Sequence, residues 1–490
     1  MEIKRGMYIK QSSLIFELPE SGEIGGKIVK ADSKEKISIK ENLLRSKPVN
    51  LPELSELDVI RHYTNLSKLN FSVDSNFYPL GSCTMKYNPK VLEKCPEEFS
   101  ELHPMIACLP GGESIAQGAL GIIYETEQLI SEITGMDGVT TFPMAGAHGE
   151  LTGIFIISAY HASKGNKKKN VIVPDSSHGT NPASAATAGY EVITIPSLSN
   201  GEMDLEAFKK AISEETAAVM MTCPNTLGIF ETKIKEISNI AHSVDALMYY
   251  DGANLNAIMG RVRPGDIGFD VVHVNVHKTF GTPHGGGGPG AGPVGVKKKL
   301  VPFLPVPRIV KDKDGKYSLL DDVPQSIGRI CGFFGNFGVV VKAFAYMLLL
   351  GKDGILKASE QAVLSANYLK EKLKAYYDLP CDRPCMHEFV LSAERQLKNG
   401  IHAIDIAKAL IDRGFHPPTV YFPLIVKEAI MIEPTETESK KTLDEFIRAM
   451  VEIAELSEKD TEILKRSPLL TPIGRLDEAK AAREARVSFE

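Results

Sequence analysis

The 490-residue sequence has no tryptophan, only seven cysteines and no apolar run long enough to cross a membrane. Its most apolar windows, such as Ala343 to Leu350, fall far short of the roughly 20 residues that a membrane-spanning helix needs. An odd number of scattered cysteines is no disulfide framework and is typical of reduced thiols. The first residues show no signal-peptide core, and Glu17 and Glu20 argue against a transit peptide. We therefore expect a cytoplasmic location without a membrane segment.

A strong charge of either sign is also missing, because the formal net charge is only -6. This balance gives no support to nucleic acid or an anionic membrane as the main partner. Potential metal ligands are sparse as well. Cys381, Cys385 and His387 lie close together, but no second cysteine and histidine cluster completes a four-ligand set. The sequence therefore predicts no metal site.

Hydrophobic residues make up 43% of the chain, enough for a large core, and the length exceeds one compact domain. Short apolar strands expected over residues 171–174, 190–195 and 217–223 alternate with helices. This order predicts an α/β fold whose sheet is mostly parallel, with right-handed crossovers. We expect four parts: an N-terminal arm (1–90), a large domain (91–350), a smaller C-terminal α/β domain (351–455) and a tail (456–490).

The alternating, β-branched segment that starts at Val271 predicts a short strand ending on His277 and Lys278. A lysine at the end of a core strand is costly unless it is paired or neutral. Desolvation lowers the pKa of a lysine and frees its amine for Schiff-base chemistry. The alternative is a surface lysine at a strand end.

A glycine run follows this lysine. Gly285, Gly287 and Gly290 satisfy the dinucleotide-binding pattern G-x-G-x-x-G. Pro289 and Pro293 prevent the helix that such a site requires, so we reject that interpretation. The run is better interpreted as a loop that passes close to a ligand beside the lysine.

A second apolar strand, over residues 246–250, stops at Asp251. Pyridoxal phosphate needs a lysine for its Schiff base and an acid that keeps its pyridine nitrogen protonated. Strands of an open α/β sheet end at one edge, where ligands bind, so Asp251 and Lys278 are expected there together. Asp251 alone could be a turn or helix-cap residue. The pair is much harder to explain by chance.

Six stretches taken together resemble one family, the glycine decarboxylase P-protein of the glycine cleavage system. Within it, the chain is most similar to subunit 2 of the two-subunit form, from about residue 50 to the tail. The stretches are residues 78–86 (Tyr-Pro-Leu-Gly-Ser-Cys-Thr-Met-Lys), 179–184 (Gly-Thr-Asn-Pro-Ala-Ser), 251–254 (Asp-Gly-Ala-Asn), 277–292, 333–338 (Phe-Phe-Gly-Asn-Phe-Gly) and 386–392 (Met-His-Glu-Phe-Val-Leu-Ser).

The resemblance implies a fold-type I pyridoxal-phosphate enzyme. The implied reaction decarboxylates glycine and transfers the aminomethyl group to the lipoyl cofactor of H-protein, which is glycine dehydrogenase (aminomethyl-transferring) activity. Another fold-type I amino-acid decarboxylase or aminotransferase is the alternative. A non-catalytic scaffold on the same fold is a third possibility, but a scaffold need keep neither Lys278 nor Asp251.

The resemblance also assigns roles to individual residues. Lys278 carries pyridoxal 5'-phosphate as a Schiff base, and His178 stacks on the ring or moves a proton. Further candidates are Ala253 under the ring, Gly146 and Ala147 at the phosphate, Thr226 and His277 within its reach, and Arg329 for the substrate carboxylate or phosphate. Residues 82–86 are implied to lie near the site.

Structural alternatives stay open for several of these residues. His178 could be a helix-cap or core histidine, and Thr226 and His277 could be local caps. Gly146 and Ala147 could belong to ordinary loop-to-helix packing, and Arg329 could form a surface ion pair. Residues 82–86 alone read as a polar loop.

The N-terminal arm is expected to lack a core and therefore to need another surface. The resemblance implies that subunit 1 supplies it in an α2β2 heterotetramer. A homodimer whose arm crosses to its twin is the alternative.

Overall fold

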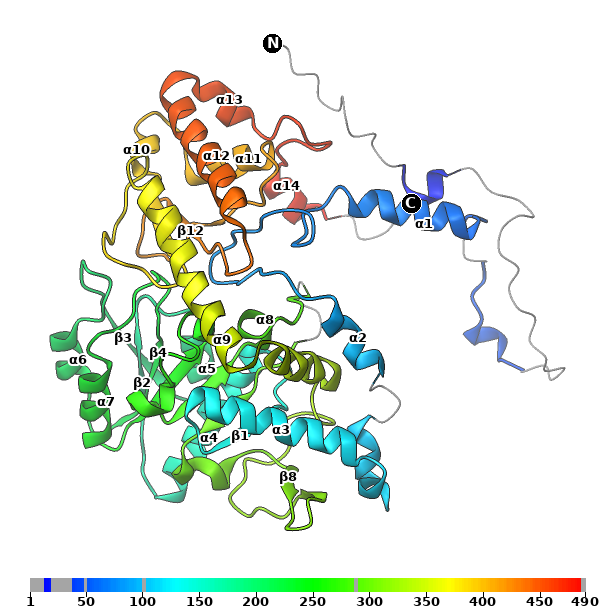
Figure 1. The fold of residues 1–490 in the computed structure, drawn as a ribbon, viewed down its shortest axis with the longest axis vertical. Helices are drawn as coiled ribbons and strands as arrows, with labels where there is room; N and C mark the ends of the chain where they lie inside the picture. The colour runs from blue at the N-terminus through cyan, green and yellow to red at the C-terminus, as the bar shows by residue number, and fades with distance from the viewer. Residues whose placement is uncertain (1–12, 19–37, 48–50, 99–102, 286–289, 486–490) are drawn as a thin grey trace. The chain divides into compact units, whose positions relative to one another are not determined.

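The structure is a computed structural model that describes residues 13–18, 38–47, 51–98, 103–285 and 290–485 (Figure 1). The chain divides into two compact units, one of residues 1–75 with 466–490 and one of residues 76–465. The first unit contains α1 (Glu56–Ser67), α14 (Glu478–Arg483) and the short 3-10 helices η1 (Ile15–Glu17) and η3 (Glu41–Leu43). None of its described residues joins a buried apolar cluster. The predicted domain boundaries stay a prediction.

The second unit is built on a seven-stranded sheet with the order β1-β7-β6-β5-β4-β2-β3. Four neighbouring pairs are parallel, and only β7 runs antiparallel to its neighbours β1 and β6. The prediction of a mostly parallel sheet is thus confirmed. The strands are β1 (Gly138–Thr140), β2 (Asn170–Pro174), β3 (Glu191–Ile195), β4 (Thr216–Thr222), β5 (Leu247–Gly252), β6 (Val271–Val274) and β7 (Val294–Val296).

Both faces of this sheet are buried, which explains its continuous apolar strands. On β5, Met248 and Tyr250 pack into one core with α7, whereas Leu247 and Tyr249 pack into another with α4. Successive side chains of a strand point to opposite faces of the sheet, so β5 contributes residues to both cores. The helices of this region are α2 (Val91–Glu98), α3 (Gln117–Thr134), α4 (Gly146–Ser163), α5 (Thr180–Thr187), α6 (Leu205–Ala211) and α7 (Ile234–Ser243).

The expected strand through Lys278 is wrong in its last residues. Strand β6 ends at Val274, and α8 (Val276–Thr279) carries His277 and Lys278. The N–H groups of Lys278 and Thr279 both donate to the Asn275 carbonyl, at 3.0 Å, and so close a helical turn. Val274 and Val276 are both buried although only Val274 is in the strand, so the alternating apolar pattern could not reveal where the strand stops.

A long helix, α9 (Phe337–Leu373), leads from the large sheet to a smaller C-terminal sheet (Figure 1). Gly351 breaks its helical geometry with φ 58°, so two helical segments meet at a kink there. The C-terminal sheet has the order β10-β12-β11 and packs on α11 and α12. Its elements are β10 (Phe389–Ser392), α10 (Glu394–Leu397), α11 (Ala403–Ile411), β11 (Thr419–Val420), β12 (Ala429–Ile432), α12 (Lys440–Lys459) and α13 (Thr461–Arg466).

The segment before α2 lies against this smaller sheet. Leu80 forms an antiparallel bridge with Ile432, and Thr419 Oγ1 donates to the Gly81 carbonyl at 2.9 Å. In the sequence between the two sheets, β8 (Arg308–Lys311) and β9 (Tyr317–Leu320) pair as an antiparallel hairpin. No helix of the described residues is long and apolar enough to cross a membrane.

Candidate active site

Asp251 lies near the end of β5, where its neighbours in register are Thr222 on β4 and His273 on β6. Its carboxylate accepts hydrogen bonds from the Ala253 N–H at 3.0 Å and from Asn181 Nδ2 and Thr222 Oγ1 at 3.2 Å. Burial acts to raise the pKa of this carboxyl, but His273, the Ala253 N–H and Lys278 together lower it below the usual value. Asp251 is therefore a buried, ionised acid at the sheet edge, where the sequence predicted it.

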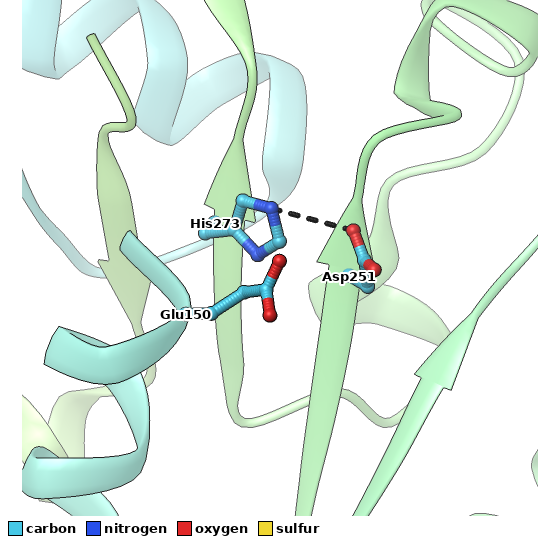
Figure 2. A group of neighbouring side chains, drawn as sticks. All are labelled: Glu150, Asp251 and His273. Atoms are coloured by element: carbon cyan, nitrogen blue, oxygen red, sulfur yellow. Dashed lines mark ion pairs between the residues drawn. The ribbon is translucent and has the colours of Figure 1, made fainter. Parts of the chain in front are cut away.

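Two buried groups that the sequence analysis missed lie beside Asp251. Figure 2 shows Glu150 from α4, Asp251 from β5 and His273 from β6 pointing toward one another. His273 Nε2 lies 3.3 Å from Asp251 Oδ1, and its Nδ1 is 2.8 Å from the Tyr249 hydroxyl. A histidine within an otherwise apolar core strand was the one signal in the sequence that could have revealed this group.

Glu150 accepts a hydrogen bond from Thr180 Oγ1 at 2.8 Å, while its other oxygen has no partner among the described residues. Burial, with the nearby charge of Asp251, raises the pKa of Glu150 to about 8. Burial also lowers the pKa of His273. The group therefore combines one charged acid with two neighbours that favour their neutral forms.

Lys278 is partly buried on α8 and acts electrostatically on two groups of acids. On one side its charge lowers the pKa of Asp251 and opposes the rise at Glu150. On the other side it opposes the rise in the pKa of Glu388 and Glu433. The charge of Lys278 therefore influences both groups.

The second group combines Glu388, which precedes β10, with Glu433, which follows β12. Phe389 and Ile432 are opposite each other in this antiparallel pair, so both carboxyls are at one end of the sheet. His387 lies between them, with Nε2 3.8 Å from Glu388 Oε1 and 3.9 Å from Glu433 Oε1. All three side chains are completely buried.

Both groups are spaced closely enough to hold a cation, since their ligand atoms lie within 4.8 Å of one another. The oxygens of Glu388 and Glu433, however, already accept hydrogen bonds from Ser82, Thr84, Asn254 and Asn256. These donors favour hydrogen-bonded carboxyls over metal ligands. The prediction of no metal stays a prediction.

His178 lies in the turn before α5, with Nδ1 2.9 Å from Thr180 Oγ1. Its ring meets Phe422 edge-to-face, with ring centroids 6.0 Å apart. The side chain is open to solvent on one side, yet the surrounding protein lowers its pKa, Asp251 opposes this shift and Lys278 adds to it. His178 therefore belongs to the same neighbourhood as Asp251 and Lys278.

Gly146 begins α4, whose preceding residue, Ala145, provides no side-chain cap. The first N–H groups of a helix have no partner within it, so Gly146 and the exposed Ala147 lie at a terminus able to bind an anion. A Cβ on Gly146 would come within 2.5 Å of Asn275, the residue before α8. Only glycine lets the start of α4 approach the lysine-bearing turn this closely.

The other predicted residues have different surroundings. Ala253 is half-buried, and its N–H holds Asp251. His277 meets His284 edge-to-face at 4.8 Å, and burial, reinforced by Lys278, lowers the pKa of His277 to about 3. Thr226 is buried and donates to the Ser176 carbonyl at 2.6 Å. Arg329 is exposed and pairs with Asp321 at 2.5 Å, and no described contact joins it to the two groups around Lys278.

Several buried polar atoms near Lys278 have no hydrogen-bond partner within the described residues. Unpaired buried polar atoms are costly, and a concentration of them is typical of a ligand site. They are Glu150 Oε2, Asn181 Oδ1, Asn275 Oδ1, Thr279 Oγ1 and Thr282 Oγ1. A polar ligand of matching size would satisfy them.

Comparisons with known proteins show which family the chain resembles. Residues 358–468 match the family described as "Glycine dehydrogenase, C-terminal domain", and residues 152–248 match "Aminotransferase class I and II". The chain is 56% identical over 483 residues to the "Probable glycine dehydrogenase (decarboxylating) subunit 2" of Caldanaerobacter subterraneus, covering 97% of this chain and 98% of that protein. The protein of the same name from Bacillus licheniformis is 54% identical, with 98% and 99% covered.

Solved structures extend the comparison to the fold. An inhibitor-bound glycine decarboxylase (P-protein) of the glycine cleavage system has a TM-score of 0.68 at 21% identity, covering 84% of this chain and 93% of that one. A NifS-like protein has a TM-score of 0.60 at 15% identity, with 78% and 100% covered. The predicted fold class is confirmed by these similarities.

Proposed function

The chain belongs to the family of glycine dehydrogenase (decarboxylating) subunit 2, and from this membership we propose that it decarboxylates glycine with pyridoxal phosphate in the glycine cleavage system. The observation that carries the proposal is the meeting of an ionised Asp251, Lys278 and a cluster of unpaired polar atoms at one sheet edge. Relatives of the same name match over nearly the whole chain, which favours this reaction over another amino-acid decarboxylase or an aminotransferase.

The residues at the sheet edge fit pyridoxal phosphate. Asp251 offers a carboxylate to a protonated ring nitrogen, and the start of α4 at Gly146 and Ala147 offers free N–H groups to a phosphate. The hydroxyls of Thr279 and Thr282 have no described partner and lie just beyond Lys278. Lys278 would hold the cofactor through its amine, and the bound cofactor would supply an electron sink for the decarboxylation.

The surrounding residues then have defined tasks. Asp251 keeps a proton on the ring nitrogen, because its carboxylate stays ionised despite burial. Asn181, Thr222 and the Ala253 N–H fix the direction of that carboxylate. Neutral Glu150 adds no second negative charge beside Asp251. We therefore assign the proton-holding role to Asp251 alone.

His178 covers the opposite side of the site in this proposal. Its lowered pKa favours a neutral imidazole near pH 7, which can stack on a ring or accept a proton. Ala253 would pack under the ring, and His277 and Thr226 would lie near the phosphate. The exposed ion pair of Arg329 with Asp321 supports a surface role, so we leave Arg329 out of the proposed site.

The name "subunit 2" of the relatives implies a partner subunit 1. We propose an α2β2 heterotetramer that passes the aminomethyl group to lipoylated H-protein. The N-terminal unit, whose described residues build no apolar cluster, supports the need for a partner surface. Seven free cysteines agree with the proposed cytoplasmic location.

Absorption spectroscopy with borohydride reduction tests the cofactor assignment. The protein incubated with pyridoxal phosphate should gain a visible-edge band, and reduction followed by peptide mapping should label Lys278. Label on another lysine would contradict the assignment. Glycine-dependent carbon-dioxide exchange with lipoylated H-protein, measured with and without subunit 1, tests the reaction and the assembly. Full exchange by a pure homodimer would overturn the heterotetramer and leave the chemistry intact.

A further inference from the structure

The segment from Leu80 to Lys86 joins the C-terminal sheet to the lysine-bearing turn. At its start, Leu80 pairs with Ile432. At its end, buried Lys86 donates to the Thr279 carbonyl on α8 at 2.9 Å and to Glu436 Oε1 at 2.9 Å. The position of this segment is therefore fixed relative to both sides of the site.

Between these ends, the backbone bends in a way that side chains rarely accept. Ser82 and Thr84 have φ of 59° and 49°, in the left-handed region. Such residues, and a β-branched threonine above all, adopt this conformation only when their surroundings impose it. Something must therefore hold Ser82 and Thr84 from outside the loop.

Glu388 and Glu433 provide that restraint. The Ser82 N–H donates to Glu388 Oε2 at 2.7 Å. The Thr84 N–H donates to Glu433 Oε2 at 3.0 Å, and the Thr84 hydroxyl donates to Oε1 at 2.5 Å. Glu388 thus binds the residue before Cys83, and Glu433 binds the residue after it.

The carboxyls are themselves rigidly placed. Both are completely buried at one end of the β10–β12 pair. Asn254 Nδ2 donates to Glu388 and Asn256 Nδ2 to Glu433, each at 3.3 Å. Both asparagines follow directly after the Asp251 strand, so the second group of acids is tied to the first through the backbone.

Cys83 lies between the two gripped residues and is partly exposed. Lys278, Glu433 and Glu388 are the charged groups that act on its thiol. Burial raises the pKa of Cys83, so its thiol favours the neutral form despite the opposing effect of Lys278.

We propose that Glu388 and Glu433 are positioning residues that hold the Ser82–Thr84 loop so that Cys83 lines the amino-acid side of the site beside Lys278. Only the identity of the amino acid rests on the proposed function. The loop and the two carboxyls therefore act together as one structural unit. His387 lies between the carboxyls and makes no described hydrogen bond to the loop. Loss of either carboxyl frees Cys83.

The experiment measures how fast iodoacetamide alkylates Cys83, by peptide mass mapping of the full chain without cofactor. Exposed Cys108 serves as the internal reference. The rate is followed against pH, because removing a carboxyl also changes the thiolate fraction. A charge effect moves the midpoint of the profile, whereas release of the loop raises its plateau.

We expect the plateau to rise about tenfold in Glu388→Gln and Glu433→Gln, the factor expected when a buried hydrogen bond that restrains a local opening is lost. Thr84→Val keeps both carboxyls and removes only the hydroxyl bond, so it should raise the plateau without moving the midpoint. Glu428→Gln is the matched control, because Glu428 also holds a backbone N–H and a histidine, but at the other end of β12. It should label as the unaltered chain does.

Pyridoxal phosphate should slow labelling of Cys83, but not of Cys108, if the loop lies beside Lys278. In the assembled enzyme, Glu433→Gln should bind the cofactor normally and lower kcat more than it changes KM for glycine. An unchanged plateau in both glutamine variants, or no protection of Cys83 by the cofactor, would overturn the proposal. Labelling needs no glycine chemistry, so failure of the proposed reaction would be recognised separately.

Discussion

Two groups of buried acids lie within electrostatic reach of Lys278, and they differ in what holds them in place. Glu150, Asp251 and His273 come from α4 and two adjacent strands of one sheet. Glu388 and Glu433 come from the far side of the chain and meet residues 82–84 across sequence separations of 306 and 349 residues. Strand pairing brings together the acids of both groups, but the second group also binds a segment from far away in the sequence that docks on its sheet. The first group is expected to govern chemistry, and the second to govern the shape of the site.

Asp251→Asn should give the largest effect. It tests whether the group that contains Asp251 governs the chemistry. An amide cannot hold the ring-nitrogen proton, so activity should fall by about 100-fold or more, roughly 3 kcal/mol in the barrier. Glycine-dependent carbon-dioxide exchange measures this change. The control is Asp270→Asn, another buried aspartate directly before β6, which binds His242 and Lys299 instead. Equal losses in the two variants would contradict a special role for Asp251.

Glu433→Ala tests whether the second group, Glu388 and Glu433, holds the shape of the site. Removing this carboxyl leaves the buried Thr84 N–H without an acceptor and creates a cavity, which should cost about 2–4 kcal/mol of unfolding free energy. Chemical denaturation of the cofactor-free chain measures the loss. Glu428→Ala removes an acceptor at a helix start and should cost only about 1 kcal/mol. A cost for Glu433→Ala no larger than that of Glu428→Ala would argue against a tightly held loop.

Glu150→Gln tests the protonation state of the first group through the pH dependence of the unfolding free energy. Because the folded pKa of Glu150 is raised to about 8, folding favours its protonated form. The stability that this proton gives is present below the unfolded pKa of about 4.3 and is lost as pH rises toward 8. Within that window the glutamine variant should remove a slope of up to about 1.4 kcal/mol per pH unit. Denaturation of both proteins at pH 5, 6 and 7 checks this, and parallel slopes would show that Glu150 is ionised in the folded state.

Arg329→Ala should have the smallest effect, because its partner Asp321 is as exposed as Arg329 itself. An exposed ion pair contributes about 0–1 kcal/mol, and activity should change by less than about twofold. Steady-state kinetics in glycine test this prediction. A large rise in KM would return Arg329 to the substrate carboxylate and add a third group to the site.

The sequence revealed the first group in part and the second hardly at all, for a physical reason. Parallel strands must end at one edge, so Asp251 after one strand and Lys278 after another could be expected to meet. The same reasoning wrongly extended the predicted strand to Lys278, because a buried turn can contain the same kinds of apolar residue as a strand. His273 was visible only as a polar residue in a core strand.

No comparable rule brings residues 82–84 to Glu388 and Glu433. Glu388 and Glu433 directly flank apolar strands in the sequence, which marks each as a polar residue near a core but not as partners. The left-handed conformations of Ser82 and Thr84 leave no trace in residue type, since neither is glycine or asparagine. Only the family resemblance of residues 78–86 indicated that this stretch lies near the site.

Lys86 has a consequence for how the molecule opens. Its ammonium binds Glu436 beyond β12, the Tyr346 hydroxyl on α9 and the Thr279 carbonyl on α8. Separating the C-terminal sheet from the turn that carries Lys278 would therefore leave the buried charge of Lys86 without some of its partners. The two parts should behave as one cooperative unit in amide hydrogen exchange, with equal opening free energies for β12 and α8. In Lys86→Met that coupling should disappear, and α8 should exchange before the sheet does.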